Sequence, residues 1–273
     1  MKRNILFLII GFVFSLSASG QSFKVDFWTA LNAKNMEKAE RTLKAWDFAD
    51  SNDSELYVAY FNFYTVKSQN AGGTNGYDKE FSQKALDFIT EGIERFPTRF
   101  DMRLGKVYML CELKNFTSYT DEVINFINYS KKIENNWKGE NFRLIDKPEE
   151  MFFGSIQDFQ EKLFAENNTS LYGHIIKISN EMIKVYPNYI QSRINLSTVY
   201  IAQKEYDKSI VTLLKAKETE PKNAILLYNI AYAYNLKGDK VNAKKHFELT
   251  VANVGEKEGK LKDAAQKQLN AMR

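Results

Sequence analysis

Apolar residues recur along most of the chain at spacings of three and four, and few stretches alternate apolar with polar residues. Helices that bury one face show this period, whereas half-buried strands need a period of two. Only 13 glycines and four prolines interrupt the pattern. The pattern therefore predicts an all-α fold built from amphipathic helices.

The segment 190–254 carries this pattern twice, with a period of 34 residues. Matched positions hold similar residues in the two copies: Leu196 and Ile230, Ser197 and Ala231, Tyr200 and Tyr234, Ser209 and Ala243, Leu213 and Phe247. Small residues allow the two helices of a hairpin to cross closely. Gly238 suits the left-handed backbone of a tight turn, and Pro187 and Pro221 each stop a second helix.

These residues and their spacing resemble the tetratricopeptide repeat (TPR) family. One departure is the fourth position, where the family favours a large aromatic side chain and this chain has Arg193 and Leu227. The resemblance implies an all-α, TPR-like α-α superhelix, or solenoid. We expect about six helix pairs and a C-terminal capping helix.

The remaining segments match the repeat less well. In 21–133 we expect degenerate TPR-like hairpins, because Leu104-Gly105-x-x-Tyr108 repeats the first-helix signature and a loop within 68–80 absorbs extra residues. The pattern fails in 134–189, where we expect a loop insertion and an atypical helix pair. In 255–273, an apolar stripe with polar flanks predicts the helix that caps an open stack.

Residues 1–20 have the layout of a secretory signal peptide. Lys2 and Arg3 precede an apolar run over 5–16, and small residues follow, so we expect cleavage after Gly20. No later apolar run is long enough to span a bilayer. We therefore expect an exported protein, periplasmic, envelope-associated or secreted, without a transmembrane segment after signal removal. Cys111 is the only cysteine, and we expect it to be a small buried side chain rather than half of an internal disulfide.

The charged and reactive residues favour neither nucleic acid binding nor catalysis. The chain has 38 lysines and arginines against 34 acidic residues, which gives no strongly basic surface. His174 and His246 lie in different hairpins, and no zinc-binding histidine pair, cysteine pair or phosphate-binding loop is present. We expect no catalytic residue, metal site or cofactor, and therefore no enzyme.

The resemblance implies that the first helices of the two matched repeats line a concave groove that binds a protein or peptide. The groove positions are Gln191, Ile194, Asn195, Thr198 and Ile201 in the first repeat, and Ile225, Tyr228, Asn229, Tyr232 and Asn235 in the second. In relatives that hold extended peptides, an asparagine at the position of Asn195 and Asn229 bonds the peptide backbone. Its amide offers a donor and an acceptor. The sequence therefore predicts an exported scaffold or adaptor of the bacterial cell envelope.

Two alternatives remain open at this stage. Aromatic residues make up 14% of the chain and crowd the segment 57–64, so exposed rings could bind peptidoglycan or another glycan. Within that segment we expect Phe63 to be the most exposed ring. The more distant alternative is a regulatory enzyme subunit with a site hidden in 134–170.

Overall fold

The computed structural model describes residues 18–72, 76–255 and 258–272, and its regular elements are all helices. The predicted all-α class is therefore confirmed for this part of the chain. Of the predicted signal peptide, residues 1–20, the segment 1–17 lies outside the described residues, and residues 18–20 stand at the start of α1. The first helices are α1 (Ala18–Asn32), α2 (Met36–Ala49), α3 (Ser54–Ala71), α4 (Lys79–Arg95), α5 (Phe100–Glu112) and α6 (Phe116–Lys132). They are followed by α7 (Pro148–Ala165), α8 (Tyr172–Val185), α9 (Gln191–Ala202), α10 (Tyr206–Thr219), α11 (Ala224–Lys237), α12 (Lys240–Asn253) and α13 (Gly259–Asn270).

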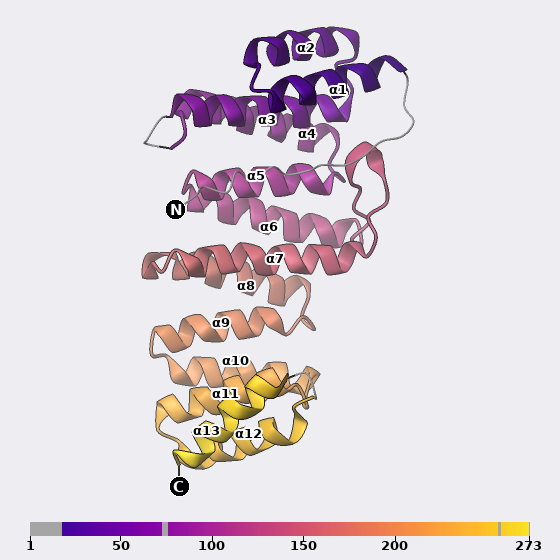
Figure 1. The fold of residues 1–273 in the computed structure, drawn as a ribbon. Coiled ribbons are helices and arrows are strands. Elements are labelled where there is room, and N and C mark those ends of the chain that lie inside the picture. Colours follow the sequence, from indigo (N-terminus) through magenta and orange to yellow (C-terminus); the bar gives the residue numbers. More distant parts are fainter. Residues whose placement is uncertain (1–17, 73–75, 256–257, 273) are drawn as a thin grey trace. The chain divides into compact units, whose positions relative to one another are not determined.

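Consecutive helices pair as antiparallel hairpins, beginning with α1–α2 and ending with α11–α12, and α13 follows as a single helix (Figure 1). This arrangement confirms the predicted six helix pairs and capping helix. The chain divides into two compact units, residues 1–155 and 156–273, and the division falls within α7. No helix in the described ranges is both long and apolar enough to cross a membrane.

Unit 1 is held together by large side chains that meet between its hairpins. Trp46, Leu43 and Phe27 form one cluster with apolar residues of α3. A second cluster joins α3, α4 and α5, where Gly92 permits a close approach: a methyl group there would lie 2.9 Å from Cβ of Tyr57. A larger residue at this position would force the two helices apart.

Unit 2 buries the small residues expected at its helix crossings. Ser197 and Ser209 in one hairpin, and Ala231 and Ala243 in the next, are all buried. Phe247 packs with Ala231 and Ala243, and Ala265 of α13 closes the same cluster. The repeat frame therefore identifies the core positions of this region correctly.

Four of the hairpin turns place a glycine or a lysine in the left-handed region of the backbone. Gly238 has φ 90°, as expected for a glycine that ends a helix. The equivalent residues of three other hairpins are lysines, Lys34, Lys114 and Lys204, with φ between 55° and 61°. Only glycine adopts this conformation without a steric penalty.

Residues 134–147, which we call the strap, form the loop insertion between α6 and α7. Trp137 of the strap is buried against Phe100 and Phe126. The next residue, Lys138, pairs its backbone with the segment before α5: its N–H donates to Thr98, and its carbonyl accepts from Phe100. The strap is therefore folded against unit 1 along part of its length.

Two sequence-based expectations about single side chains are wrong. Phe63 is 1% exposed and belongs to the core of unit 1, because it points back toward α1 and α2 rather than outward. Cys111 is only half-buried, because it lies near the C-terminal end of α5, where the helix surface is partly open.

Candidate functional site

The most exposed apolar face of unit 2 lies on α11. Ile225, Tyr232 and Leu236 are 48%, 36% and 38% exposed, and Asn229 lies between them. Their spacings of four, three and four residues bring all four to one side of the helix. We call these four residues the α11 seam.

Stacked rings fix the middle of this seam. Tyr232 stacks on Tyr228 with ring centres 6.4 Å apart, and Tyr228 meets the edge of Phe247 at 5.5 Å. Burial, followed by the neighbouring Tyr232, raises the pKa of Tyr228. Its phenol therefore stays neutral at physiological pH, and the exposed ring beside it is held on a rigid apolar base.

The α11 seam has one amide side chain, that of Asn229. Within the described residues, no hydrogen bond or other polar contact reaches the Asn229 side chain. Asn235, in contrast, accepts a 2.7 Å hydrogen bond from Lys240. Asn229 is therefore the amide through which a bound partner can exchange a donor and an acceptor.

The predicted positions on α9 are arranged differently. Asn195 is buried, and its amide nitrogen donates to the side-chain oxygens of Gln157 at 2.9 Å and Gln160 at 2.5 Å. Its oxygen accepts from Gln191 at 3.0 Å. In this structure the amide of Asn195 therefore joins α9 to α7, and a peptide would have to displace these partners.

Two further α9 positions, Ile194 and Thr198, differ in exposure. Ile194 is buried in the core of unit 2. Thr198 is exposed, although its hydroxyl already donates to the Ile194 carbonyl at 3.0 Å. Among the predicted groove residues, Ile194 and Asn195 are therefore packing positions, whereas Thr198, Ile225 and Tyr232 are accessible.

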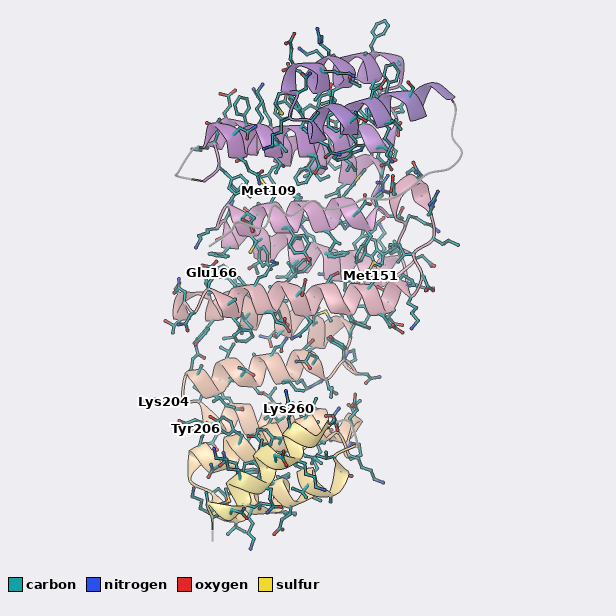
Figure 2. The ribbon with its side chains drawn as sticks, viewed as in Figure 1. Met109, Met151, Glu166, Lys204, Tyr206 and Lys260 are labelled. Carbon is teal, nitrogen blue, oxygen red and sulfur yellow. The ribbon has the colours of Figure 1, made fainter. Side chains whose placement is uncertain are left out.

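One flank of the α11 seam is bordered by α13. Leu269 and Met272 of α13 pack against the cluster that contains Phe247 and Tyr228. Figure 2 labels Lys260 of α13 and Lys204 in the turn between α9 and α10. The helix α11 itself contains one charged residue, Lys237, and no carboxylate.

Leu236 and Gln160 are absent from the sequence-based candidates. Leu236 follows Tyr232 by four residues, so extension of the exposed positions by one helical turn would have found it. Gln160 stands on the apolar face of the helix predicted after Pro148, and it is buried with a 2.7 Å hydrogen bond to Ser179. A polar residue on a buried helix face indicates that its side chain has a hydrogen-bond partner, but the sequence does not identify that partner.

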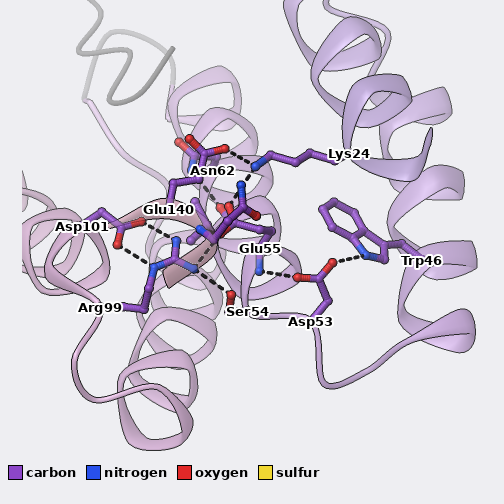
Figure 3. Close-up of polar contacts among 11 residues, drawn as sticks. Lys24, Trp46, Asp53, Ser54, Glu55, Asn62, Arg99, Asp101 and Glu140 are labelled. Carbon is purple, nitrogen blue, oxygen red and sulfur yellow. Dashed lines mark hydrogen bonds and ion pairs between the residues drawn. The ribbon is translucent and has the colours of Figure 1, made fainter. Parts of the chain in front are cut away.

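Unit 1 contains a second polar arrangement, centred on Arg99 (Figure 3). The Arg99 guanidinium is fully buried and donates to Glu55 at 2.6 Å, to Ser54 at 2.7 Å and to both oxygens of Asp101. Lys24 of α1 forms ion pairs with Glu55 and with Glu140 of the strap. We call these six residues the Arg99 network.

The charges of the Arg99 network stabilise one another. Burial raises the pKa of Glu55, but Arg99 and Lys24 outweigh it and hold that pKa below its ordinary value. The Asn141 backbone N–H also donates to Glu55 at 3.0 Å, so the strap is tied to α3 through the same carboxylate. Every member has partners inside the protein, which indicates a structural role.

The aromatic side chains of α3 are buried or half-buried. Tyr60 and Tyr64 stack on Phe88 of α4 at 4.2 Å and 5.6 Å, and Tyr64 also stacks on Phe81. The rings therefore cover one another. Tyr57, Phe61 and Phe63 are buried, so this segment offers only parts of Tyr60 and Tyr64 to the glycan-binding alternative.

The described residues also offer no metal-binding group of three or more histidine, cysteine, aspartate or glutamate side chains. His246 is buried, and its Nε2 lies 3.3 Å from the Lys217 ammonium. A cation at that distance disfavours a second positive charge on the imidazole.

Comparison with solved structures returns tetratricopeptide repeat proteins. YrrB, described as a TPR protein with an unusual peptide-binding site, matches at 12% identity and a TM-score of 0.42, over 82% of this chain and 97% of that one. A tetratricopeptide repeat protein from Parabacteroides merdae matches at 14% identity and a TM-score of 0.39, over 94% of each chain. MamA from Desulfovibrio magneticus matches at 13% identity and 0.32, over 87% and 96%. No protein-family model and no curated protein matches the chain.

Proposed function

We propose that this protein is a non-enzymatic scaffold or adaptor that binds another protein through the α11 seam. The observation that carries the proposal is the seam itself: three exposed apolar side chains on one helix face, with the uncommitted Asn229 amide between them. Clustered exposed apolar side chains of this kind mark protein interaction sites more often than isolated ones do. The helix is held by the core of its hairpin, so the surface is formed before a partner arrives.

The cellular setting is a further part of the proposal. Lys2, Arg3, the apolar run over 5–16 and the small residues before Gln21 support export, and hence a partner in the cell envelope or outside it. N-terminal sequencing of the protein recovered from the exporting cell tests this point. An intact N-terminus on a cytoplasmic protein would contradict it and leave the binding proposal standing.

The binding proposal is tested by affinity capture from an envelope extract with paired variants. Tyr232→Lys and Leu236→Lys place charges on the seam and should abolish capture of a stoichiometric protein partner. Val241→Lys is the matched control, because Val241 is 80% exposed on the adjoining helix α12 but lies outside the seam. Equal capture by all three variants would reject the seam as the interface.

A further inference from the structure

We infer that the strap is a clasp: its tip, residues 139–147, opens and closes on unit 1 together with the start of α1. The inference concerns unit 1 and does not depend on the α11 seam. Two segments that are far apart in the chain meet at the clasp, since Lys24 and Glu140 are separated by 116 positions. The clasp couples the exposure of the strap tip to the placement of α1.

A single ammonium group bridges two carboxylates when the clasp is closed (Figure 3). Lys24 Nζ donates to Glu55 of α3 at 3.1 Å and also to Glu140 of the strap tip. Arg99 divides its charge between Glu55 and Asp101, so it does not take the place of Lys24. Carboxylates repel each other, and the repulsion is stronger where water is scarce. Closure of the tip therefore depends on α1 for the charge that lies between them.

The strap has a buried base and an exposed tip. Asn135 and Trp137 of the base are buried, and the backbone of Lys138 is bonded on both sides to the segment 98–100. In contrast, none of the residues 139–147 is buried. Segments with few buried contacts open locally at a low cost in free energy. The tip can therefore leave the surface of unit 1 while the base stays in place.

The tip is also bonded within itself, and part of its backbone is strained. The Gly139 N–H donates to the Arg143 carbonyl at 2.8 Å. Asn141 and Phe142 have φ of 52° and 55°, which asparagine tolerates and phenylalanine adopts only at a cost. Such a backbone persists where surrounding contacts impose it. The bond from the Asn141 N–H to Glu55 is one of these contacts, so its loss favours the open tip.

The start of α1 is held in a similar way. Within residues 22–26 no side chain is buried, although Phe23 packs half-buried against the core. The next residue, Phe27, is fully buried and fixes the helix from that point onward. Lys24 therefore lies in a part of α1 that has little apolar burial of its own. Because the same ammonium holds the start of α1 and the strap tip, each should stabilise the other.

Amide hydrogen exchange of the full chain, measured residue by residue by NMR, tests the clasp. Lys24→Met removes the bridging charge and keeps a long side chain. The Asn141 amide should then exchange about 10-fold faster, as expected for the loss of a hydrogen bond to a charged group. The Lys138 amide of the base should keep its protection. Lys44→Met is the matched control and should change neither amide, because the ion pair of Lys44 with Glu40 lies on the surface of α2.

A second variant separates repulsion between carboxylates from loss of packing. Glu140→Gln removes one of the two carboxylates, so adding it to Lys24→Met should restore protection of the Asn141 amide. By reciprocity, Glu140→Gln alone should speed exchange of the amides of residues 22–26. If Lys24 acts only by packing, the double variant will exchange as fast as Lys24→Met alone.

Ionic strength provides a third measurement, with opposite signs in the two proteins. The side chains of Lys24 and Glu140 are 21% and 22% exposed, so dissolved ions can screen their attraction. An increase in salt from about 0.05 M to about 0.5 M should therefore lower the protection of the Asn141 amide in the wild-type protein. In Lys24→Met the same salt screens the repulsion between the carboxylates and should raise that protection.

Three results would overturn the inference. Unchanged exchange of Asn141 in Lys24→Met would show that α1 does not hold the strap tip. An equal loss of protection at Lys138 would show that the strap unfolds as a whole and has no separate tip. A salt effect of the same sign in both proteins, or no rescue by Glu140→Gln, would show that the two carboxylates do not control the opening.

Discussion

Asn195 and Asn229 occupy equivalent positions in the two matched repeats, yet their surroundings give them different roles. Asn195 is enclosed by Gln157, Gln160 and Gln191, whereas the amide of Asn229 faces outward from the described part of unit 2. The 34-residue frame predicts that both side chains leave their helices in the same direction. It cannot predict that α7 presents two glutamines to one of them, because α7 lies outside the repeat pattern.

The pair of asparagines leads to a prediction about stability. Asn195→Ala removes the amide that donates to the side-chain oxygens of Gln157 and Gln160, and it leaves the buried Gln160 oxygen without this donor. The change should therefore lower the free energy of unfolding by about 1–3 kcal/mol. Asn229→Ala should change it by less than about 0.5 kcal/mol, because the amide has no internal partner to lose. Urea denaturation measures the free energy of unfolding of both variants. Equal losses would contradict the assignment of Asn195 to internal packing and of Asn229 to an open surface.

His246 leads to a prediction about pH. Burial, followed by the nearby cations Lys217 and Lys245, lowers the pKa of His246 below its ordinary value of 6.5, although its bond to the Asn242 carbonyl opposes the shift. The unfolded chain then binds more protons than the folded one as the pH falls through about 6.5. Stability should therefore decrease from neutral pH downward, until the lowered pKa of the folded state is passed.

The measurement compares melting temperatures between about pH 7.5 and pH 5 for the wild-type protein and for His246→Gln. Glutamine keeps hydrogen-bonding capacity without a titrating group in this range. The variant should show a weaker dependence on pH across this window. If the melting temperatures of the two proteins change with pH in parallel, His246 does not contribute to the pH dependence of stability.

At the scale of the helical element, the hairpin turns show how much the repeat pattern could reveal. Gly238 identifies its turn through its residue type, and the structure confirms the left-handed backbone there. Lys204 stands 34 residues earlier and adopts the same conformation. Lysine is not a turn-forming residue, so only the repeat frame, and not composition, indicates the turn at this position.

These turns lead to a prediction with a matched control. Lys204→Gly should raise the free energy of unfolding by up to about 1 kcal/mol. Glycine relieves the steric strain of the left-handed backbone at this position, and this gain exceeds the backbone entropy that glycine loses on folding. Gly238→Ala should lower it by about 1 kcal/mol for the same reason. Thermal unfolding of both variants checks the pair, and destabilisation by Lys204→Gly would mean that the lysine side chain makes a compensating contact.

At the scale of the whole molecule, sequence reasoning identifies the helical hairpins and a loop insertion after residue 133, but not the backbone conformation of the strap. The strap holds five of the nine non-glycine residues with positive φ among the described ranges: Glu134, Asn135, Asn141, Phe142 and Lys147. No local pattern predicts such a backbone. It is maintained by contacts with distant residues, such as the bond from the Asn141 N–H to Glu55 across 86 positions.

The Arg99 network leads to the last prediction, which concerns the independence of the two units. Arg99→Met leaves the buried carboxylate of Glu55 without its main partner, and loss of one member of a buried ion pair costs about 3–5 kcal/mol. Arg41→Met is the control, because the Arg41 ion pair with Glu37 is exposed and contributes little.

Hydrogen exchange should locate the loss that Arg99→Met causes. In helical repeats each hairpin contacts only its neighbours, so destabilisation stays local unless the whole array unfolds together. The amides of α3, α5 and the strap should therefore exchange faster, while those of α11 and α12 keep their protection. Faster exchange throughout the described chain would show instead that the two units unfold as one. In that case a change in the Arg99 network would also alter the α11 seam, and binding there would depend on residues of unit 1.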